Sequence, residues 1–233
     1  MVEKLAQAGI IQSKTVKDCM QKVDRGNYVM YREDAYTDSP QSIGYMQTIS
    51  APHMHAHALE DLLPALKAAS ESADVKQLAI LDVGCGSGYL TACFGRLVDK
   101  GSPTNLIGKP GKVYGIDYIP ELVDLSKTNI MKQDKDLIDS DTVQLQVGDG
   151  WKGLPAGAPY HAIHVGAAAD GLPKHLMTQL AVGGTMIIPI GPEGGFQNLY
   201  KIDRVAESPS FKESDYTIKP LIGVRYVPLV RLS

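Results

Sequence analysis

The stretch Leu78–Gly88 reads LAILDVGCGSG and decides the fold that we expect for the chain. An apolar run, broken only by Asp82, leads into Gly84, Gly86 and Gly88. Such a run is typical of a strand buried on both faces of a parallel sheet, and the glycines permit a tight turn that a ligand can approach closely. A strand, a glycine turn and a following helix are how open α/β sheets build a nucleotide site at the carboxyl ends of their strands.

The rest of the chain continues the alternation of strands and helices. Six more strands are predicted, over Lys112–Ile116, Thr142–Val147, Tyr160–Val165, Thr185–Ile190, Leu199–Val205 and Ile222–Val230. Helices are predicted after the glycine turn (burying Tyr89, Leu90, Cys93 and Leu97), from Pro120 onward, and over Pro173–Leu180. Loops are predicted over Lys67–Gln77, Asp99–Lys112 and Asp134–Asp141. This order predicts an α/β, Rossmann-like fold, with a mostly parallel sheet flanked by helices. We expect one domain over residues 1–233, with an N-terminal helical and loop segment over 1–66 and the core, closed by C-terminal strands, over 78–233.

The N-terminal segment contains two predicted helices separated by an irregular stretch. Thr15–Val23 has apolar residues on one face, and Thr15 with Asp18 resembles a capping pair. Asn27–Ile49 contains four tyrosines, has turn signals at Asp38-Ser39-Pro40 and Ile43-Gly44, and has no helical period, which is typical of a functional loop. In the next helix we expect Ser50 to be the N-cap, Pro52 to lie in the first turn, and the buried stripe to be Leu59, Leu62, Leu63 and Leu66.

Three histidines near this helix start raise the question of a metal. His53, His57 and Asp61 would share one helical face, four residues apart. The HExxH pattern is missing and no cysteine supports the group, so we predict no metal site.

The composition excludes several classes of function. The net charge is −3 and the hydrophobic content 44%, so no basic field favours a nucleic acid, and no apolar run approaches the ~20 residues of a membrane span. Three cysteines without a CxxC pair, and no signal-peptide pattern, favour a reducing compartment. We expect a cytoplasmic monomer that binds neither nucleic acid nor membrane.

The residues around the glycine turn narrow the choice of nucleotide. The dinucleotide pattern G-x-G-x-x-G fails because Tyr89 stands at its last position. An acid at Asp82 is unfavourable beside a pyrophosphate but suits the ammonium group of S-adenosylmethionine. Asp117 ends the next strand, where it can accept from ribose hydroxyls, and Asp149 follows the third, where it could contact the adenine edge.

Beyond these acids, the chain resembles the protein-L-isoaspartate O-methyltransferases over nearly its whole length. The resemblance rests on YTDSPQSIGYMQTISAPHMHAHALEDL (Tyr36–Leu62), LDVGCGSG (81–88), VGDGW (147–151), PYHAIHVGAAA (159–169), GGTMIIPIGP (183–192) and GVRYVPL (223–229). It implies the fold of S-adenosylmethionine-dependent methyltransferases and methyl transfer to the α-carboxyl of L-isoaspartyl, and also D-aspartyl, residues in damaged proteins. The ester then collapses to a succinimide, and hydrolysis returns part of it to normal Asp. The loop Asp99–Lys112 is longer than in compact family members.

The resemblance also implies a set of site residues. By matching position, the cofactor contacts fall on Gln47, Thr48, Ile49, Ser50, His55, Ser87, Asp117, Asp149 and Gly150, to which the turn itself adds Asp82 and Gly84. The active-site serine falls on Ser50. No metal belongs to the set.

The chemistry of the residues predicts catalysis by positioning. A carboxylate nucleophile is ionised at neutral pH, so no general base is needed, and Ser50 would orient it against the methyl group. The segment Gly223–Leu229, with Val224 and Tyr226, could pair with an extended substrate peptide as an added strand. Three alternatives stay open at this point: a methyltransferase for another small-molecule or protein carboxylate, a silent binding module that uses the tyrosine-rich segment, and an NAD oxidoreductase.

Overall fold

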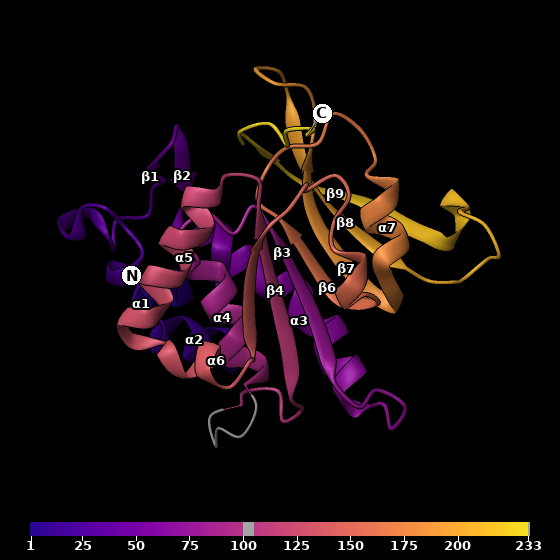
Figure 1. The fold of residues 1–233 in the computed structure, drawn as a ribbon, viewed down its shortest axis with the longest axis horizontal. Coiled ribbons are helices and arrows are strands. Elements are labelled where there is room, and N and C mark those ends of the chain that lie inside the picture. Colours follow the sequence, from indigo (N-terminus) through magenta and orange to yellow (C-terminus); the bar gives the residue numbers. More distant parts are fainter. Residues whose placement is uncertain (100–104, 233) are drawn as a thin grey trace.

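The structure is a computed structural model that describes residues 1–99 and 105–232. A seven-stranded sheet forms its centre, with the order β5-β4-β3-β6-β7-β8-β9 (Figure 1). The first five strands in this order are parallel, and β8 and β9 are antiparallel additions at one edge. The bounds are β3 Leu78–Val83, β4 Gly111–Asp117, β5 Val143–Val147, β6 Tyr160–Val165, β7 Leu180–Ile190, β8 Gln197–Arg204 and β9 Tyr216–Val224. The predicted mostly parallel α/β sheet is confirmed.

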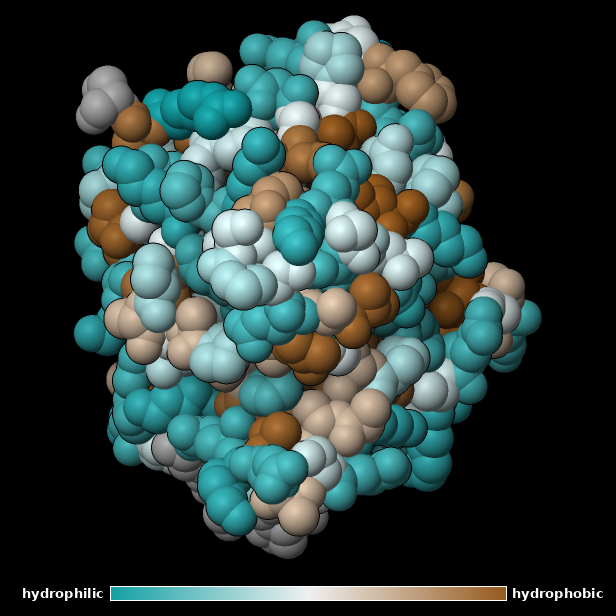
Figure 2. Space-filling model, turned by 90° about the vertical axis from the view of Figure 1, so that its right-hand side faces the viewer, coloured by the Kyte–Doolittle hydropathy of each residue, from teal (hydrophilic) through white to brown (hydrophobic). Residues whose placement is uncertain are grey.

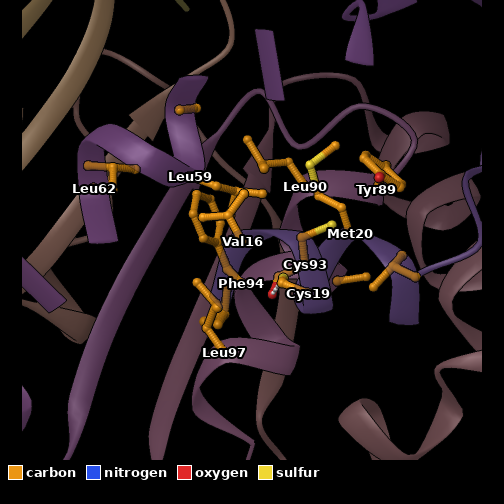
Figure 3. Close-up of a cluster of buried hydrophobic side chains, with 14 of the residues drawn as sticks. Val16, Cys19, Met20, Leu59, Leu62, Tyr89, Leu90, Cys93, Phe94 and Leu97 are labelled. Carbon is orange, nitrogen blue, oxygen red and sulfur yellow. Dashed lines mark hydrogen bonds between the residues drawn. The ribbon is translucent and has the colours of Figure 1, made fainter. Parts of the chain in front are cut away.

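Helices cover both faces of the sheet. The helices are α1 Val2–Gln7, α2 Lys14–Lys22, α3 Pro52–Glu71, α4 Tyr89–Val98, α5 Pro120–Gln133, α6 Lys135–Asp139 and α7 Lys174–Gln179. One hydrophobic cluster joins α1 to α5 with one face of the sheet, and a second joins α7 and Trp151 with the other. Figure 3 shows the centre of the first cluster, where side chains of α2, α3 and α4 interlock. The predicted buried residues of α4 and of the stripe on α3 are confirmed.

The start of α2 differs from the prediction. The helix begins at Lys14, and its cap is Ser13, whose Oγ accepts from the Val16 N–H at 3.1 Å. The predicted pair of Thr15 and Asp18 is therefore wrong. Ser13 is favoured because Glu60 of α3 also accepts from the Ser13 N–H and hydroxyl, at 2.8 and 3.1 Å, which ties the cap to a neighbouring helix.

The start of α3 also differs. Ala51 is the N-cap and Pro52 the first helical residue, so Ser50 lies one position before the cap and makes no capping hydrogen bond. Pro52 suits the first helical position because it lacks an N–H and presets a helical φ, and the next N–H, that of His53, donates to Asp38 Oδ1 at 2.9 Å. The helix continues to Glu71, into the predicted link Lys67–Gln77.

The predicted irregular stretch Asn27–Ile49 contains regular structure. A two-stranded hairpin, β1 Gln41–Gly44 and β2 Gln47–Ile49, follows the 3-10 turns Arg25–Asn27 and Arg32–Asp34. Tyr45 and Met46 form the hairpin tip with φ of 52° and 57°. The sequence did not indicate the hairpin because hairpin tips with such angles usually carry Asn or Gly, and here they carry Tyr and Met.

The C-terminal strand is the largest correction. It runs over Tyr216–Val224 and not over Ile222–Val230; beyond it, an isolated bridge joins Pro228 to Ala168. The physical reason is that the side chain of Gln197, and not a neighbouring strand, binds the backbone of Tyr226.

Smaller differences concern the loops. The predicted loop Asp134–Asp141 contains α6, and the predicted helix Pro173–Leu180 gives way to β7 at Leu180. Residues 100–104 of the predicted loop Asp99–Lys112 lie outside the described residues. Within the described ranges, no helix is long and apolar enough to cross a membrane.

Candidate active site

A cavity of about 670 Å³ opens at the carboxyl ends of the parallel strands. Its walls come from the β1–β2 hairpin, the start of α3, the turns after β3, β4, β5 and β6, and residues 222–230. From β3 the chain passes to β4 on one side and later to β6 on the other, so the cavity lies at a topological switch point, where open α/β sheets bind ligands. Its size suits a small molecule or cofactor.

Asp117 holds the glycine turn beside this cavity. Its Oδ2 accepts from the Gly86 N–H and its Oδ1 from the Ile119 N–H, both at 3.1 Å. Burial raises the pKa of Asp117, and the backbone donors oppose that shift. The turn needs glycine at Gly88, which has φ of 88°, caps α4 and lies where a Cβ would be 3.2 Å from Ser126 of α5.

Asp82 lies deeper, at 1% exposure. Its carboxylate accepts from the Thr91 hydroxyl at 2.5 Å and pairs with Nδ1 of His164 at 2.8 Å. Asp82 and His164 line a narrow pocket of about 40 Å³ that shares Thr48, Ser50 and the glycine turn with the wide cavity. The acid that was predicted to face a cationic ligand is thus already bonded to protein donors through both oxygens.

Ser50 lies between the two spaces and lines both. Burial raises the pKa of Tyr226, and a side-chain hydrogen bond with Ser50 acts against that rise. The Ser50 carbonyl accepts from the Arg25 guanidinium at 2.8 Å. The backbone of Ser50 is therefore held in place by Arg25, and its hydroxyl is hydrogen-bonded to the neutral hydroxyl of Tyr226.

Residues 225–230, the C-terminal strap, form one wall of the cavity. Gln197 accepts from the Tyr226 N–H at 2.7 Å and donates to the Tyr226 carbonyl at 3.3 Å. Ala168 accepts from the Leu229 N–H and donates to the Val227 carbonyl, both at 2.8 Å, and Trp151 Nε1 donates to the Leu229 carbonyl at 2.9 Å. Three separate parts of the core thus hold the strap over the strand ends.

Gly150 lies directly beneath the strap. A Cβ there would lie 2.7 Å from Leu229 and 2.8 Å from Val83, so only glycine permits this close approach. Neighbouring Asp149 does not line either space; its Oδ1 accepts from the Trp151 N–H at 2.9 Å and so shapes the turn that presents Gly150.

The structure brings most of the predicted site residues together. The wide cavity is lined by Gln47, Thr48, Ser50, Gly84, Asp117, Gly150, Val224 and Tyr226, and the narrow pocket adds Ile49, His55, Asp82 and Ser87. Our sequence analysis missed Arg25, His164, Gln197 and Trp151. The sequence could have indicated His164, because it lies near the carboxyl end of β6, the strand next to β3. The other three residues bind backbone atoms that are distant in the sequence.

In the structure the histidines at the start of α3 are not gathered into one group of side chains. His53 donates from Nδ1 to Asp38 Oδ1 at 2.9 Å, and its ring is 6.5 Å from that of His57. Over the described part of the chain, no group of three or more His, Cys, Asp or Glu side chains is placed to hold a metal ion.

Comparison with known proteins agrees with this geometry. A family model described as Protein-L-isoaspartate(D-aspartate) O-methyltransferase matches residues 1–233. Two curated Arabidopsis thaliana proteins, Protein-L-isoaspartate O-methyltransferase 2 and 1, are 45% and 43% identical; each match covers 98% of this chain, and 66% and 89% of the respective relative. The crystal structure of a Plasmodium falciparum protein-L-isoaspartate O-methyltransferase in complex with S-adenosyl-L-homocysteine has a TM-score of 0.79 at 32% identity, covering 98% of this chain and 96% of that one. The chain therefore belongs to the protein-L-isoaspartate(D-aspartate) O-methyltransferase family and is a methyltransferase.

Proposed function

We propose that this methyltransferase transfers the methyl group of S-adenosylmethionine to the α-carboxylate of L-isoaspartyl residues, and of D-aspartyl residues, in damaged proteins. The ester then forms a succinimide, and hydrolysis returns part of it to normal Asp. The observation that carries the proposal is one cavity at the switch point of the sheet, lined by Asp117 and the glycine turn on one side and by Ser50 and Tyr226 on another. This arrangement suits two reactants that must meet.

The residues at the strand ends would hold the cofactor. The carboxylate of Asp117 keeps lone pairs beyond the two that accept backbone N–H groups, and these can accept ribose hydroxyls. Gly84 and Gly150 leave room for close approach, and Ser87 and His55 line the narrow inner end. Asp82 would attract an ammonium group there through lone pairs that remain. Asp149 would act indirectly, through the turn that carries Gly150.

The residues that contact the methyl acceptor would act by orienting its carboxylate. The cofactor supplies an electrophilic methyl group, and a carboxylate needs no general base to attack it. The hydroxyl of Ser50 can donate to one carboxylate oxygen and so direct the other. The transfer neutralises charge, so a neutral donor is preferable to a cation, which would stabilise the ground state more than the transition state. The C-terminal strap would exclude water from the reacting groups.

The substrate chain would enter along the free side of β9. This strand pairs only with β8 among the described strands, and its last residues, with Val224, line the cavity next to Tyr226. Main-chain pairing at such an edge recognises a peptide without demanding particular side chains.

The remaining expectations about the molecule are also proposals. Cys19, Cys85 and Cys93 are buried free thiols, which favours a reducing cytoplasm. A single domain that acts as a monomer agrees with the surface in Figure 2, where apolar residues form separate small patches among hydrophilic ones on the face shown. The net charge of −3 disfavours nucleic acid, and the chemistry calls for no metal.

The test uses a pair of peptides. One carries an L-isoaspartyl residue, and its twin carries normal Asp at the same position; each is incubated with the enzyme and S-adenosylmethionine labelled in the methyl group. Base-labile label in the first peptide alone supports the proposal. Label in neither, together with label in small carboxylic acids, would instead favour a methyltransferase for another carboxylate.

A further inference from the structure

Arg25 is a buried cation without an ion-pair partner among the residues that the structure describes. It is 1% exposed, and its Nε donates to the Ala35 carbonyl at 3.0 Å. One terminal nitrogen donates to the Ser50 carbonyl at 2.8 Å, and the other lies 3.2 Å from Nδ1 of His55. Burying an unpaired charge is costly, so these neutral acceptors must hold the guanidinium well.

The contact with His55 has only one possible direction. A guanidinium carries donors and no acceptor, so Nδ1 of His55 must accept the hydrogen bond. The proton of the neutral imidazole is therefore on Nε2. Burial, followed by the charge of Arg25, holds the pKa of His55 well below its ordinary value, so the ring stays neutral. The titratable or charged groups that face this ring are Arg25, Tyr89, His53 and His164.

The second histidine of the narrow pocket has the opposite arrangement. Nδ1 of His164 lies 2.8 Å from the Asp82 carboxylate, which accepts, so Nδ1 of His164 carries a proton. His55 and His164 line the same space of about 40 Å³. The narrow pocket is thus lined by a histidine that carries its proton on Nε2, His55, and by a carboxylate, Asp82. This pairing matches a group with a carboxylate and an ammonium, such as the amino-acid end of the cofactor.

We propose that Arg25 is a positioning residue that fixes the proton of His55 on Nε2 and holds the Ser50 backbone in place. The guanidinium of Arg25 binds both residues at once. It therefore links the position of the His55 ring to the position of Ser50, whose hydroxyl would orient the methyl acceptor. The assignment of the ligand rests on the proposed function; the tautomer and its dependence on Arg25 do not.

The tautomer can be measured directly in the full-length protein. Imidazole ¹⁵N shifts of protein labelled with ¹⁵N-histidine distinguish Nε2–H from Nδ1–H rings, and a His55→Gln variant identifies the His55 signals. We expect the Nε2–H form in the wild type, unchanged from pH 8 to pH 6. An Nδ1–H ring, or a ring that becomes charged in this range, would overturn the proposal.

Variants then test the dependence on Arg25. In Arg25→Met the His55 signals should become those of exchanging tautomers, and the affinity for S-adenosyl-L-homocysteine should fall at least about tenfold. Arg25→Lys keeps the charge with a single nitrogen, and it should give an intermediate result if the methionine variant does not fold. The control is Arg32→Met, since Arg32 is exposed and paired with Asp24. An unchanged His55 tautomer in both Arg25 variants would refute the role of Arg25, whatever peptide the enzyme methylates.

Discussion

Replacing Gln197 by Ala should loosen the C-terminal strap without unfolding the core. Gln197 is 2% exposed, and its side chain makes a 2.7 Å bond with the Tyr226 N–H and 3.3 Å bonds with the carbonyls of Pro192 and Tyr226. Losing one good neutral hydrogen bond and two long ones, and leaving the Tyr226 N–H without its partner, costs about 2 kcal/mol. That corresponds to roughly a 30-fold increase in the opening equilibrium of the strap.

Hydrogen exchange of the Tyr226 amide measures this opening directly. The Tyr226 amide of Gln197→Ala should exchange roughly 30-fold faster than in the wild type, while amides of β3 and β6 keep their protection. The strap is a cavity wall, so the affinity for S-adenosyl-L-homocysteine should fall by up to the same factor in calorimetry. Gln133→Ala, at an exposed residue near the end of α5, is the matched control. If the Tyr226 amide exchanges at the wild-type rate, Gln197 does not hold the strap and the reasoning is wrong.

Three further changes test the site and its electrostatics. Ser50→Ala should lower turnover of an isoaspartyl peptide by about tenfold or more and leave cofactor affinity nearly intact; lost affinity with unchanged turnover per bound cofactor would refute the orienting role. Asp117→Ala should weaken S-adenosyl-L-homocysteine binding in calorimetry by about tenfold or more, because it removes both the ribose acceptor and the anchor of the Gly86 N–H; wild-type affinity would exclude this role. Burial lowers the pKa of both His55 and His161 in the folded state, so the unfolded chain binds more protons below pH 6.5 and stability falls as the pH drops from there. Urea unfolding should therefore show a lower stability at pH 5.5 than at pH 7, and His55→Gln should remove the part of that loss that comes from His55; an equally large loss in that variant would contradict the assignment.

Much of the fold could be predicted from short-range patterns. The apolar run Leu78–Leu81 with the glycines after it located the central strand, and alternation located β4, β5 and β6 to within a residue or so. These patterns work because strands buried on both faces must be apolar along their whole length. The positions of Asp82 and Asp117 beside one opening could be predicted for a related reason, since parallel strands bring their carboxyl ends to one edge, whereas Asp149, which follows the third strand, lines neither space.

The strap and the Arg25 contacts could not be predicted in this way. Gln197 and Arg25 act on backbone atoms of Tyr226 and Ser50, 29 and 25 positions away. Almost every residue type offers a backbone carbonyl and N–H, so the sequence does not indicate which backbone group Gln197 or Arg25 binds. The same reason explains the misplaced C-terminal strand: residues 225–230 look extended and apolar, but their backbone groups are bound by Gln197, Ala168 and Trp151 and not by a strand.

The acids of the site are held in place before any ligand arrives. Asp82 accepts from Thr91 and His164, and Asp117 accepts from two backbone N–H groups. A carboxylate has about four acceptor positions, so each acid has capacity left for a ligand while its own orientation is fixed. A ligand then meets groups that lose little further freedom on binding, which improves affinity without new contacts. Since methyl transfer to a carboxylate requires no proton transfer, this fixed geometry, extended by Arg25 to His55 and Ser50, is the main contribution that the protein can make to the rate.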